Sequence, residues 1–501
     1  MLDGMSGCGN VTSSVRAMGI DVGSSNVKAA IIALDGGRVR ELAVARRSVA
    51  DLDAAGLVAA ALAAAADALA ACAGPVAVIG IASMAETGAL VDASGRPSGP
   101  LIRWDRGGDV RARLGLAGNL DPAWLHARTG APLTPKLPLL SWAELVREGV
   151  PDGARWAFTA DLVAAALTGR LATDHTLAGR SGAYRLPAPG DPLPGDWDEE
   201  LLTAVGIPRT LLGAVLAPDE PVGVVDRGLP DARGAVVRIA GHDHAVAARA
   251  AGATAPGVVV HSLGTTEAVL ALAADGRAVD RAAAGAHGIS VVRGVDGDRE
   301  GVLAGSPAGG ALIADWRRRA IAAGADADAL LAAEPDERGS ALALPYPAGR
   351  QCPSPDPGAG YRLVDADTHD PATELGGILR GLAAHGAWMR DTVVELTGAP
   401  PARIVATGAP VRRNDRLAAL MASLAGSPLP VVDLDAPVAA GAAALAAERE
   451  GLTAHCEAPV RTVPAAHLAA PVLRARFARA LAESSADSAP RAAASIPEGA
   501  S

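Results

Sequence analysis

Cysteine is scarce in this chain, and its four copies lie far apart. Cys8, Cys72, Cys352 and Cys456 are spread over 501 residues. Structural zinc sites and disulfide frameworks both need cysteines at short, regular spacings. The spacing therefore excludes both as the basis of the fold.

The chain also has fewer basic than acidic residues. The chain has 45 basic and 55 acidic residues, which gives a formal net charge of -10. A protein that binds nucleic acid usually presents a basic patch to the phosphate backbone. We therefore expect a small-molecule partner and no nucleic acid.

The first residues lack the order of a secretory signal, in which basic residues precede an apolar run, because Asp3 stands where the basic region would be. The longest apolar stretch, residues 57–74, is mostly alanine and contains Asp67. This composition favours a helix packed on a sheet over a membrane span. We predict a cytoplasmic protein with no membrane partner.

Lysine is nearly absent as well. It occurs only at Lys28 and Lys136, and the other 43 of the 45 basic residues are arginines. Lysine carries a compact point charge, whereas arginine presents a planar fork of donors. The two lysines either survive by chance or mark positions where an ammonium group is needed.

The chain does have the length and the apolar content of a two-domain protein. Its 501 residues exceed the usual size of one hydrophobic core, and an apolar fraction of 50% excludes general disorder. Strand-like and helix-like stretches alternate along the sequence. This alternation indicates an α/β architecture.

The order of the predicted elements is more informative. Strands are predicted over residues 17–20, 27–34 and 42–47, followed by a helix over 57–73 and a strand over 76–82. This β-β-β-α-β order resembles the opening of the actin-like ATPase fold, whereas a dinucleotide-binding fold would alternate strands and helices from its start. We predict two actin-like (ribonuclease H-like) domains with a cleft between them.

Composition divides the chain into four parts. We expect a leader over residues 1–17 that is disordered or precedes the true start, an N-terminal domain over 18–247, a C-terminal domain over 248–464, and a low-complexity tail over 465–501 that is disordered from about 483. Residues 100–235 carry five of the seven tryptophans and look like a substrate-binding insertion. Most of these rings are expected to pack in its core.

Two similar glycine turns follow apolar runs in the two halves. Residues 21–28 read Asp-Val-Gly-Ser-Ser-Asn-Val-Lys, and residues 262–267 read Ser-Leu-Gly-Thr-Thr-Glu. A phosphoryl-transfer site mainly positions groups and neutralises charge. Asp21 is suited to hold a metal ion through water, and Lys28 would add a positive charge. An ordinary glycine hairpin is the alternative for either turn alone.

Asp243 follows an apolar strand at residues 236–240 and opens a helix that is predicted to reach Ala250. Free N–H groups and the helix dipole would keep its carboxylate ionised near neutral pH. Such a carboxylate is suited to act as a general base; a helix N-cap is the alternative. His242 and His244 lack a third metal ligand, which favours contacts to substrate or packing.

From Met18 to about Gly451 the chain resembles the FGGY family of carbohydrate kinases. The phosphate motifs of this family resemble residues 21–28 and 264–266, and its Leu-Thr-Gly-x-x-x-Thr-Asp stretch resembles residues 167–174. The resemblance implies Asp243 as the catalytic base, ATP and Mg²⁺ as cofactors, and Asp21 on the metal side. The nucleotide-binding residues that it implies are Gly23, Ser24, Ser25, Lys28, Gly264, Thr265, Thr266, Gly309, Gly310, Gly408, Ala409 and Asn414.

The chain departs from this family at two motifs. Ala409 and Pro410 replace glycines in the loop on the adenosine side, and Leu139 stands where the family has a tryptophan three residues after Lys136. Both changes lie away from the residues assigned to phosphoryl transfer.

The resemblance also implies substrate contacts at Glu86, Trp104, Asp243 and His244. Glu86 matches a carboxylate of the resembling glycerol kinases, but Ala85 replaces the arginine beside it, which argues against glycerol. The indole face of Trp104 suits the apolar side of a sugar ring.

These patterns predict a kinase that transfers the γ-phosphate of ATP to a hydroxyl of a small sugar, ketose or polyol, and a homodimer is one oligomeric state open to it. The alternatives are a nucleotide-binding regulator on the same fold, favoured by the altered loop at Ala409, and a hydrolase of the same superfamily that would use Asp243 to activate water. The sequence identifies neither the sugar nor the hydroxyl.

Overall fold

The computed structural model describes residues 15–488, except 73, 107–113, 116–119, 334–338, 367, 369, 467 and 468. Most of the expected leader and the last residues of the expected tail lie outside this part of the chain. Residues 15–17, which we assigned to the leader, belong instead to the first strand, because Val15 and its neighbours pair with strand β2.

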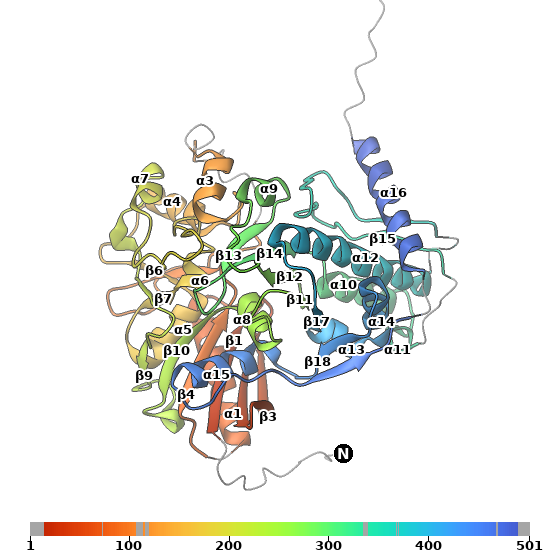
Figure 1. Cartoon of the computed structure of the whole chain (residues 1–501). Helices are drawn as coiled ribbons and strands as arrows, with labels where there is room; N and C mark the ends of the chain where they lie inside the picture. The colour runs from red at the N-terminus through yellow and green to blue at the C-terminus, as the bar shows by residue number, and fades with distance from the viewer. Residues whose placement is uncertain are drawn as a thin grey trace, which may run out of the picture.

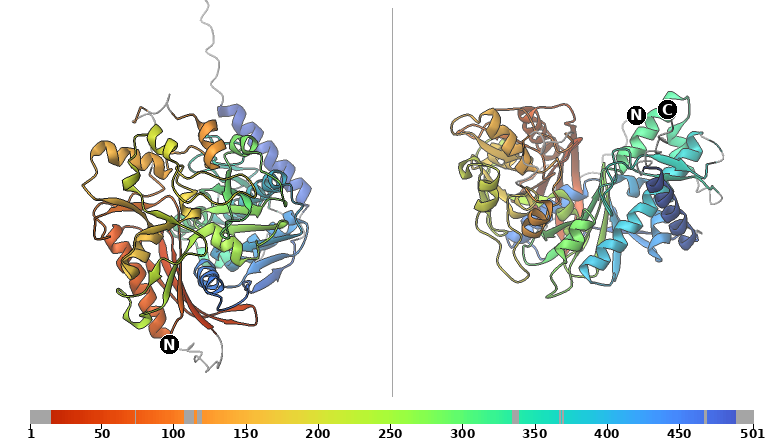
Figure 2. Two further views of the ribbon diagram at one scale, coloured as in Figure 1. Left: turned by 60° about the vertical axis from the view of Figure 1, so that its left-hand side comes forward. Right: turned by 90° about the horizontal axis from the view of Figure 1, so that it is seen from above.

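The structure has two lobes, each built on its own β-sheet (Figures 1 and 2). The first sheet has six strands in the order β3-β2-β1-β4-β10-β9. Their bounds are β1 Val15–Val22, β2 Asn26–Asp35, β3 Arg38–Ser48, β4 Val78–Ser83, β9 Gly223–Val224 and β10 Val236–His242. The first four strands and helix α1 (Ala54–Ala71) confirm the predicted β-β-β-α-β order.

The second sheet has seven strands in the order β13-β14-β12-β11-β17-β18-β19. Their bounds are β11 Val258–Leu263, β12 Glu267–Leu272, β13 Ser290–Arg293, β14 Glu300–Ser306, β17 Arg403–Thr407, β18 Leu429–Val432 and β19 Val460–Val463. Strand β11 pairs antiparallel with β12 and parallel with β17, as β1 pairs with β2 and β4 in the first sheet. The two lobes therefore repeat one arrangement, with a glycine turn between the first two strands of each.

Helices cover both sheets. The helical bounds are α3 Pro122–Thr129, α4 Pro138–Glu148, α5 Thr159–Thr168, α6 His175–Ala178, α7 Glu199–Ala204, α8 Asp243–Ala250, α9 Arg281–Ala286, α10 Gly310–Ala322, α11 Ala327–Ala332, α12 Pro371–Thr397, α13 Ala409–Arg413, α14 Asp415–Ala425, α15 Pro437–Arg449 and α16 Ala470–Ser488, with 3₁₀ turns η1 Arg209–Leu211 and η2 Pro230–Ala232. Short strand pairs complete the structure: β5 Gly88–Val91 with β6 Arg155–Phe158, β7 Ala172–Asp174 with β8 Ala214–Leu216, and β15 Leu342–Leu344 with β16 Arg362–Val364.

Helix α15 comes late in the sequence but packs on β1 and β4 of the first sheet. The approach is close: a Cβ on Gly19 would lie 1.7 Å from the carbonyl oxygen of Ala439, and one on Gly80 would lie 2.0 Å from that of Ala442. Glycine on the strands and alanine on the helix therefore allow the two backbones to meet. The same helix also packs against α8, which opens with Asp243.

Helix α1 is long and apolar enough to span a membrane by length and composition alone. In this structure it packs against β2 and β3, as the sequence predicted for residues 57–73. Leu57, Ala61, Ala64, Ala65 and Ala68 are among its buried residues. The helix is therefore a part of the first lobe.

The insertion holds a cluster of aromatic rings. Trp142 makes edge-to-face contacts with Trp156, Phe158 and Trp197 at centroid distances of 5.9, 6.2 and 5.5 Å. All four side chains are buried. The expectation that most tryptophans of this region pack in its core is confirmed for these three.

Composition gave no sign of helix α16 in the expected tail. Leu473, Phe477 and Ala480 of this helix are buried, and α16 packs on α12. Apolar residues at helical spacing on one side of α16 explain why the segment up to Ser488 is ordered as a helix.

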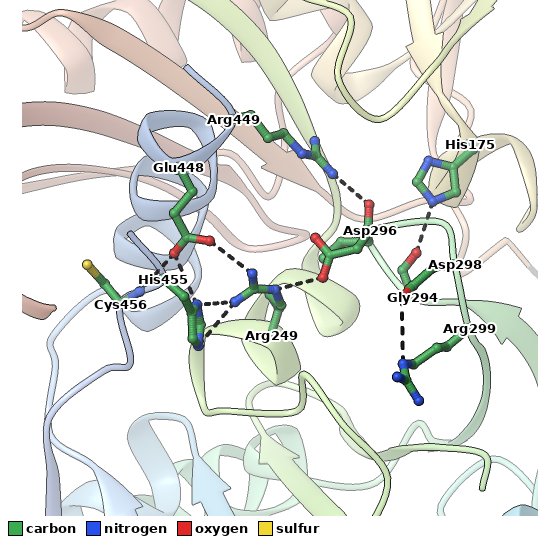
Figure 3. Close-up of polar contacts among 11 residues, drawn as sticks. His175, Arg249, Gly294, Asp296, Asp298, Arg299, Glu448, Arg449, His455 and Cys456 are labelled. Atoms are coloured by element: carbon green, nitrogen blue, oxygen red, sulfur yellow. Dashed lines mark hydrogen bonds and ion pairs between the residues drawn. The ribbon is translucent and has the colours of Figure 1, made fainter. Parts of the chain in front are cut away.

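The turn between β13 and β14 links the second sheet to helices that pack on the first (Figure 3). Arg249, at the end of α8, lies 2.9 Å from Asp296 of this turn and 2.9 Å from Glu448 of α15. Arg449 donates a hydrogen bond to the Val295 carbonyl at 2.6 Å. Through Arg249, helix α8 therefore contacts this turn of the second lobe as well as α15, which packs on the first sheet. These contacts help to hold α8, which begins with Asp243, in place.

Candidate active site

A cavity of about 720 Å³ lies between the two lobes. It is lined from the first lobe by Ser24, Met84, Glu86, Trp104, Lys136, Arg180, His242, Asp243 and His244, and from the second by Thr266, Glu267, Ala268, Ser290, Leu303, Gly305, Ser306, Pro307 and Gln351. The sequence-predicted residues Ser24, Glu86, Trp104, Asp243, His244 and Thr266 therefore meet in one space.

Asp21 and Lys28 are opposite each other in the β1–β2 hairpin. Lys28 Nζ lies 3.5 Å from Oδ2 of Asp21, whose residue is 5% exposed. Burial raises the pKa of Asp21, the charge of Asp243 raises it further, and Lys28 opposes the shift. The turn between them holds Gly23, Ser24 and Ser25, and the Gly23 N–H closes it on the Asn26 carbonyl at 3.1 Å.

Asp243 is the first residue of α8, as predicted. Its Oδ1 accepts a hydrogen bond from the backbone N–H of His244 at 2.7 Å and lies 3.1 Å from Nε2 of His242. Burial raises the pKa of Asp243, and the charge of Glu86 adds to this shift. We expected the free N–H groups and the helix dipole to favour the ionised carboxylate, but burial outweighs them and the net shift of the pKa is upward.

His242 and His244 stand beside Asp243, with ring centroids 5.3 Å apart. Possible ligand atoms of all three residues lie within 4.8 Å of one another. The third possible metal ligand, which the sequence did not reveal, is thus Asp243 itself. Burial lowers the pKa of His242 well below its ordinary value, so this ring is neutral near pH 7.

The second glycine turn is braced by the start of α10. The N–H of Gly310 donates to the Gly264 carbonyl at 2.8 Å, and that of Ala311 donates to the Thr265 carbonyl at 3.0 Å. A Cβ on Gly309 would lie 2.8 Å from the carbonyl carbon of Thr266, and one on Gly310 would lie 2.5 Å from the Gly264 oxygen. The glycine pair therefore allows α10 to approach the turn.

Gly408, Ala409 and Asn414 are not among the residues that line the cavity. Gly408 has a φ of +109°, and a Cβ there would lie 2.0 Å from the Leu263 carbonyl oxygen. Asn414 caps α14 by accepting from the Leu417 N–H at 2.9 Å, while its buried Nδ2 has no hydrogen-bond partner among the described residues. This segment therefore contains a buried side-chain donor, Asn414 Nδ2, and a glycine, Gly408, that lets the main chain pass close to Leu263.

On the other side of the cavity, Glu86 forms a buried ion pair with Arg180. Nε and Nη2 of Arg180 lie 3.2 and 2.7 Å from Oε1 of Glu86. Although burial opposes ionisation, Arg180 and Lys136 together lower the pKa of Glu86 to about 2. Glu86 is therefore a carboxylate at neutral pH. The backbone N–H of Trp104 is held by Thr87 Oγ1 at 3.0 Å.

Two hydrogen bonds join the lobes across this half of the cavity. Arg180 Nη1 donates to Ser290 Oγ at 2.5 Å, and Lys136 Nζ donates to Gln351 Oε1 at 3.2 Å. Sequence reasoning missed Arg180, Ser290 and Gln351, and it noted Lys136 only as a rare lysine in a partly kept motif. Arg180 is one of 43 arginines, so composition could not single it out.

Two repeated sheets, each with a glycine turn between its first antiparallel strands, and a cavity between them define a protein of the two-domain actin-like fold. Models of the FGGY family of carbohydrate kinases match the chain over residues 16–249 for the N-terminal domain and 259–448 for the C-terminal domain. The chain belongs to this family.

Solved structures of this family share the fold. A gluconate kinase from Lactobacillus acidophilus superposes with a TM-score of 0.78 and 18% identity, covering 95% of this chain and 99% of that one. A xylulose kinase from Lactobacillus acidophilus gives 0.77 and 18%, again covering 95% and 99%. A glycerol kinase from Plasmodium falciparum gives 0.76 and 13%, covering 96% and 99%. No curated protein matches the sequence.

Proposed function

We propose that this chain is a kinase that transfers the γ-phosphate of Mg²⁺-bound ATP to a hydroxyl group of a small sugar, ketose or polyol, with Asp243 as the general base. The observation that carries the proposal is the position of Asp243. It opens α8 in the cavity that Ser24, Glu86 and Trp104 line from the first lobe and Thr266 lines from the second.

The geometry suits Asp243 for proton transfer. Burial raises the pKa of its carboxylate, which makes it a stronger base than an exposed aspartate. The His244 N–H fixes one of its oxygens, so the other is available to accept a proton from the acceptor hydroxyl. The closed lobes would exclude water, which competes as an acceptor.

The residues present fit a magnesium-bound nucleotide triphosphate. Asp21 would supply a carboxylate to the metal side, Lys28 would supply positive charge, and Ser24 and Thr266 of the two glycine turns line the cavity. Gly309, Gly310 and Gly408 let their backbones pack closely against the second turn, and Asn414 Nδ2 is a buried donor that has no hydrogen-bond partner among the described residues. When bound, the nucleotide supplies the electrophilic phosphorus, and the metal neutralises its oxygens.

The names of the structural neighbours do not select one acceptor. They include a sugar acid, a ketose and a polyol, namely gluconate, xylulose and glycerol. At identities of 13 to 18%, none of these substrates transfers to this chain by similarity.

Replacement of Asp243 tests the proposal. ADP release would be followed with ATP, Mg²⁺ and a panel of ketoses, polyols and sugar acids, with an acceptor-free control. D243N is expected to lower acceptor-dependent turnover by at least about 10³-fold while nucleotide binding persists. The matched control is D328N, an exposed aspartate that also lies in the first turn of a helix.

The same assay separates the alternatives. ADP release that needs no acceptor would indicate a hydrolase, and nucleotide binding without turnover on any acceptor would indicate a regulator. Near-normal turnover in D243N would overturn the assignment of the base.

A further inference from the structure

Lys136 is a cation in the acceptor half of the cavity that forms no ion pair with any of the described residues. Its Nζ donates to the amide oxygen of Gln351 at 3.2 Å and lies 6.0 Å from the centroid of the Trp104 ring. Among the described residues, no carboxylate oxygen lies within 4.0 Å of this nitrogen. The other lysine, Lys28, has such a partner in Asp21.

The nearby carboxylates of Glu267 and Glu86 contact other side chains. Both oxygens of Glu267 contact histidines, at 2.6 Å from His261 and 3.3 Å from His385. One oxygen of Glu86 receives two donors of Arg180. Arg180 and Glu86 form an ion pair with each other, so Lys136 is left in the acceptor half without a carboxylate oxygen within 4.0 Å among the described residues.

The surroundings of Lys136 make this charge costly without a ligand. Burial lowers the pKa of Lys136, and the nearby charge of Arg180 acts in the same direction, while Glu86 opposes the shift. An ammonium group has three donors, and the amide of Gln351 takes only one of them. A hydrogen bond between two charged groups is roughly twice as strong as one between neutral groups, so an anion would use the remaining donors best.

On the basis of the kinase function proposed above, we propose that the acceptor is a polyhydroxy carboxylic acid whose carboxylate binds Lys136. Oε2 of Glu86 makes no hydrogen bond with the described residues and can accept from an acceptor hydroxyl. A single ammonium group matches a monoanion, whereas a phosphate dianion normally recruits several donors. Trp104 closes the site with an apolar face that suits the C–H side of such a chain.

The test measures binding and turnover separately. Five- and six-carbon aldonates, each paired with the alditol of the same configuration, and the matching sugar phosphates would be titrated by calorimetry. At least one aldonate is expected to bind at least about 10-fold more tightly than its alditol. K136Q is expected to remove this preference, and K136R to keep part of it. R96Q, which removes an exposed cation of the same lobe, is expected to keep all of it.

The outcomes distinguish this inference from the proposed function. Aldonate-selective binding that depends on Lys136 supports the inference even if no acceptor yields ADP, which would overturn the kinase function alone. Phosphorylation of neutral ketoses or polyols with no preference for acids would support the kinase and overturn the inference. Preferred binding of sugar phosphates, or an acid preference that survives in a folded K136Q variant, would also overturn it.

Discussion

Glu86 Oε1 lies 2.7 Å from Nη2 of Arg180, in an ion pair whose two side chains are each 11% exposed. The pair lines the half of the cavity where we propose that the acceptor binds, and Arg180 extends it to Ser290 of the second lobe. It therefore connects the proposed acceptor site to both lobes.

Removing the charge of Glu86 is expected to destabilise the protein. E86Q leaves the guanidinium of Arg180 buried without a counter-charge, which costs about 3 kcal/mol in the free energy of unfolding. Because the pKa of Glu86 falls from 4.5 to about 2 on folding, its contribution is complete above about 4.5 and is lost as the pH falls toward 2. The melting temperatures of wild type and E86Q would be measured at pH 7 and at pH 4. A difference in melting temperature between the two proteins that is the same at both pH values would contradict this prediction.

The raised pKa of Asp243 predicts an acid limb in the pH–rate profile. The base works only as a carboxylate, so kcat/KM should fall as the pH drops through the pKa of the folded protein, which lies above the ordinary 3.8. Initial rates at fixed saturating Mg²⁺ and ATP from pH 4 to pH 8 would locate the limb. A profile that stays flat down to pH 4 would show that the pKa is not raised in this way.

The same burial predicts that D243N stabilises the protein while it removes activity. Below pH 3.8 both the folded and the unfolded chain hold the proton, and stability is unaffected. As the pH rises, the unfolded state loses its proton first, so the carboxylate lowers the free energy of unfolding, fully so above the folded pKa. The melting temperature of D243N should exceed that of wild type at pH 7, and the gain should shrink in acid. D328N, at an exposed site, should show no such gain.

Gly310 should be essential to the second glycine turn. In G310A the new methyl group would lie 2.5 Å from the Gly264 oxygen and 2.8 Å from Cγ of Pro410, so the turn or α10 must move. We expect the KM for ATP to rise by roughly 10-fold or more, with a smaller effect on the acceptor KM. G360A is the matched control, since a Cβ there meets no atom within 4 Å. Equal KM values for ATP in the two variants would contradict the prediction.

Arg249 should stabilise the connection between the lobes. R249M removes its contacts with Asp296, Glu448 and His455 at once, and we expect a loss of about 2 kcal/mol in the free energy of unfolding, because the side chain is 14% exposed. R317M removes an exposed ion pair with Asp328 and should change stability by less than about 1 kcal/mol. Urea denaturation of both variants at low and high salt compares them, and similar losses would refute a special role for Arg249.

Local patterns in the sequence predicted the first strands, the two glycine turns and the helix that Asp243 opens. Apolar runs, glycine turns and helix starts each involve only adjacent residues, so the strands up to β4 and the place of Asp243 at the start of α8 were predicted closely. The matching turns at Ser24 and Thr266 were recognised for the same reason, since each is read from a few adjacent residues.

The contacts in the half of the cavity where we propose that the acceptor binds exist only in the tertiary structure. Arg180 is 94 residues from Glu86, and Gln351 is 215 residues from Lys136, so no local pattern indicates that they meet. The return of α15 to the first sheet is likewise a long-range contact, made possible by Gly19 and Gly80. The charge states of Asp243 and Lys136 depend on burial and on neighbouring charges, which exist only after the two lobes have closed around them.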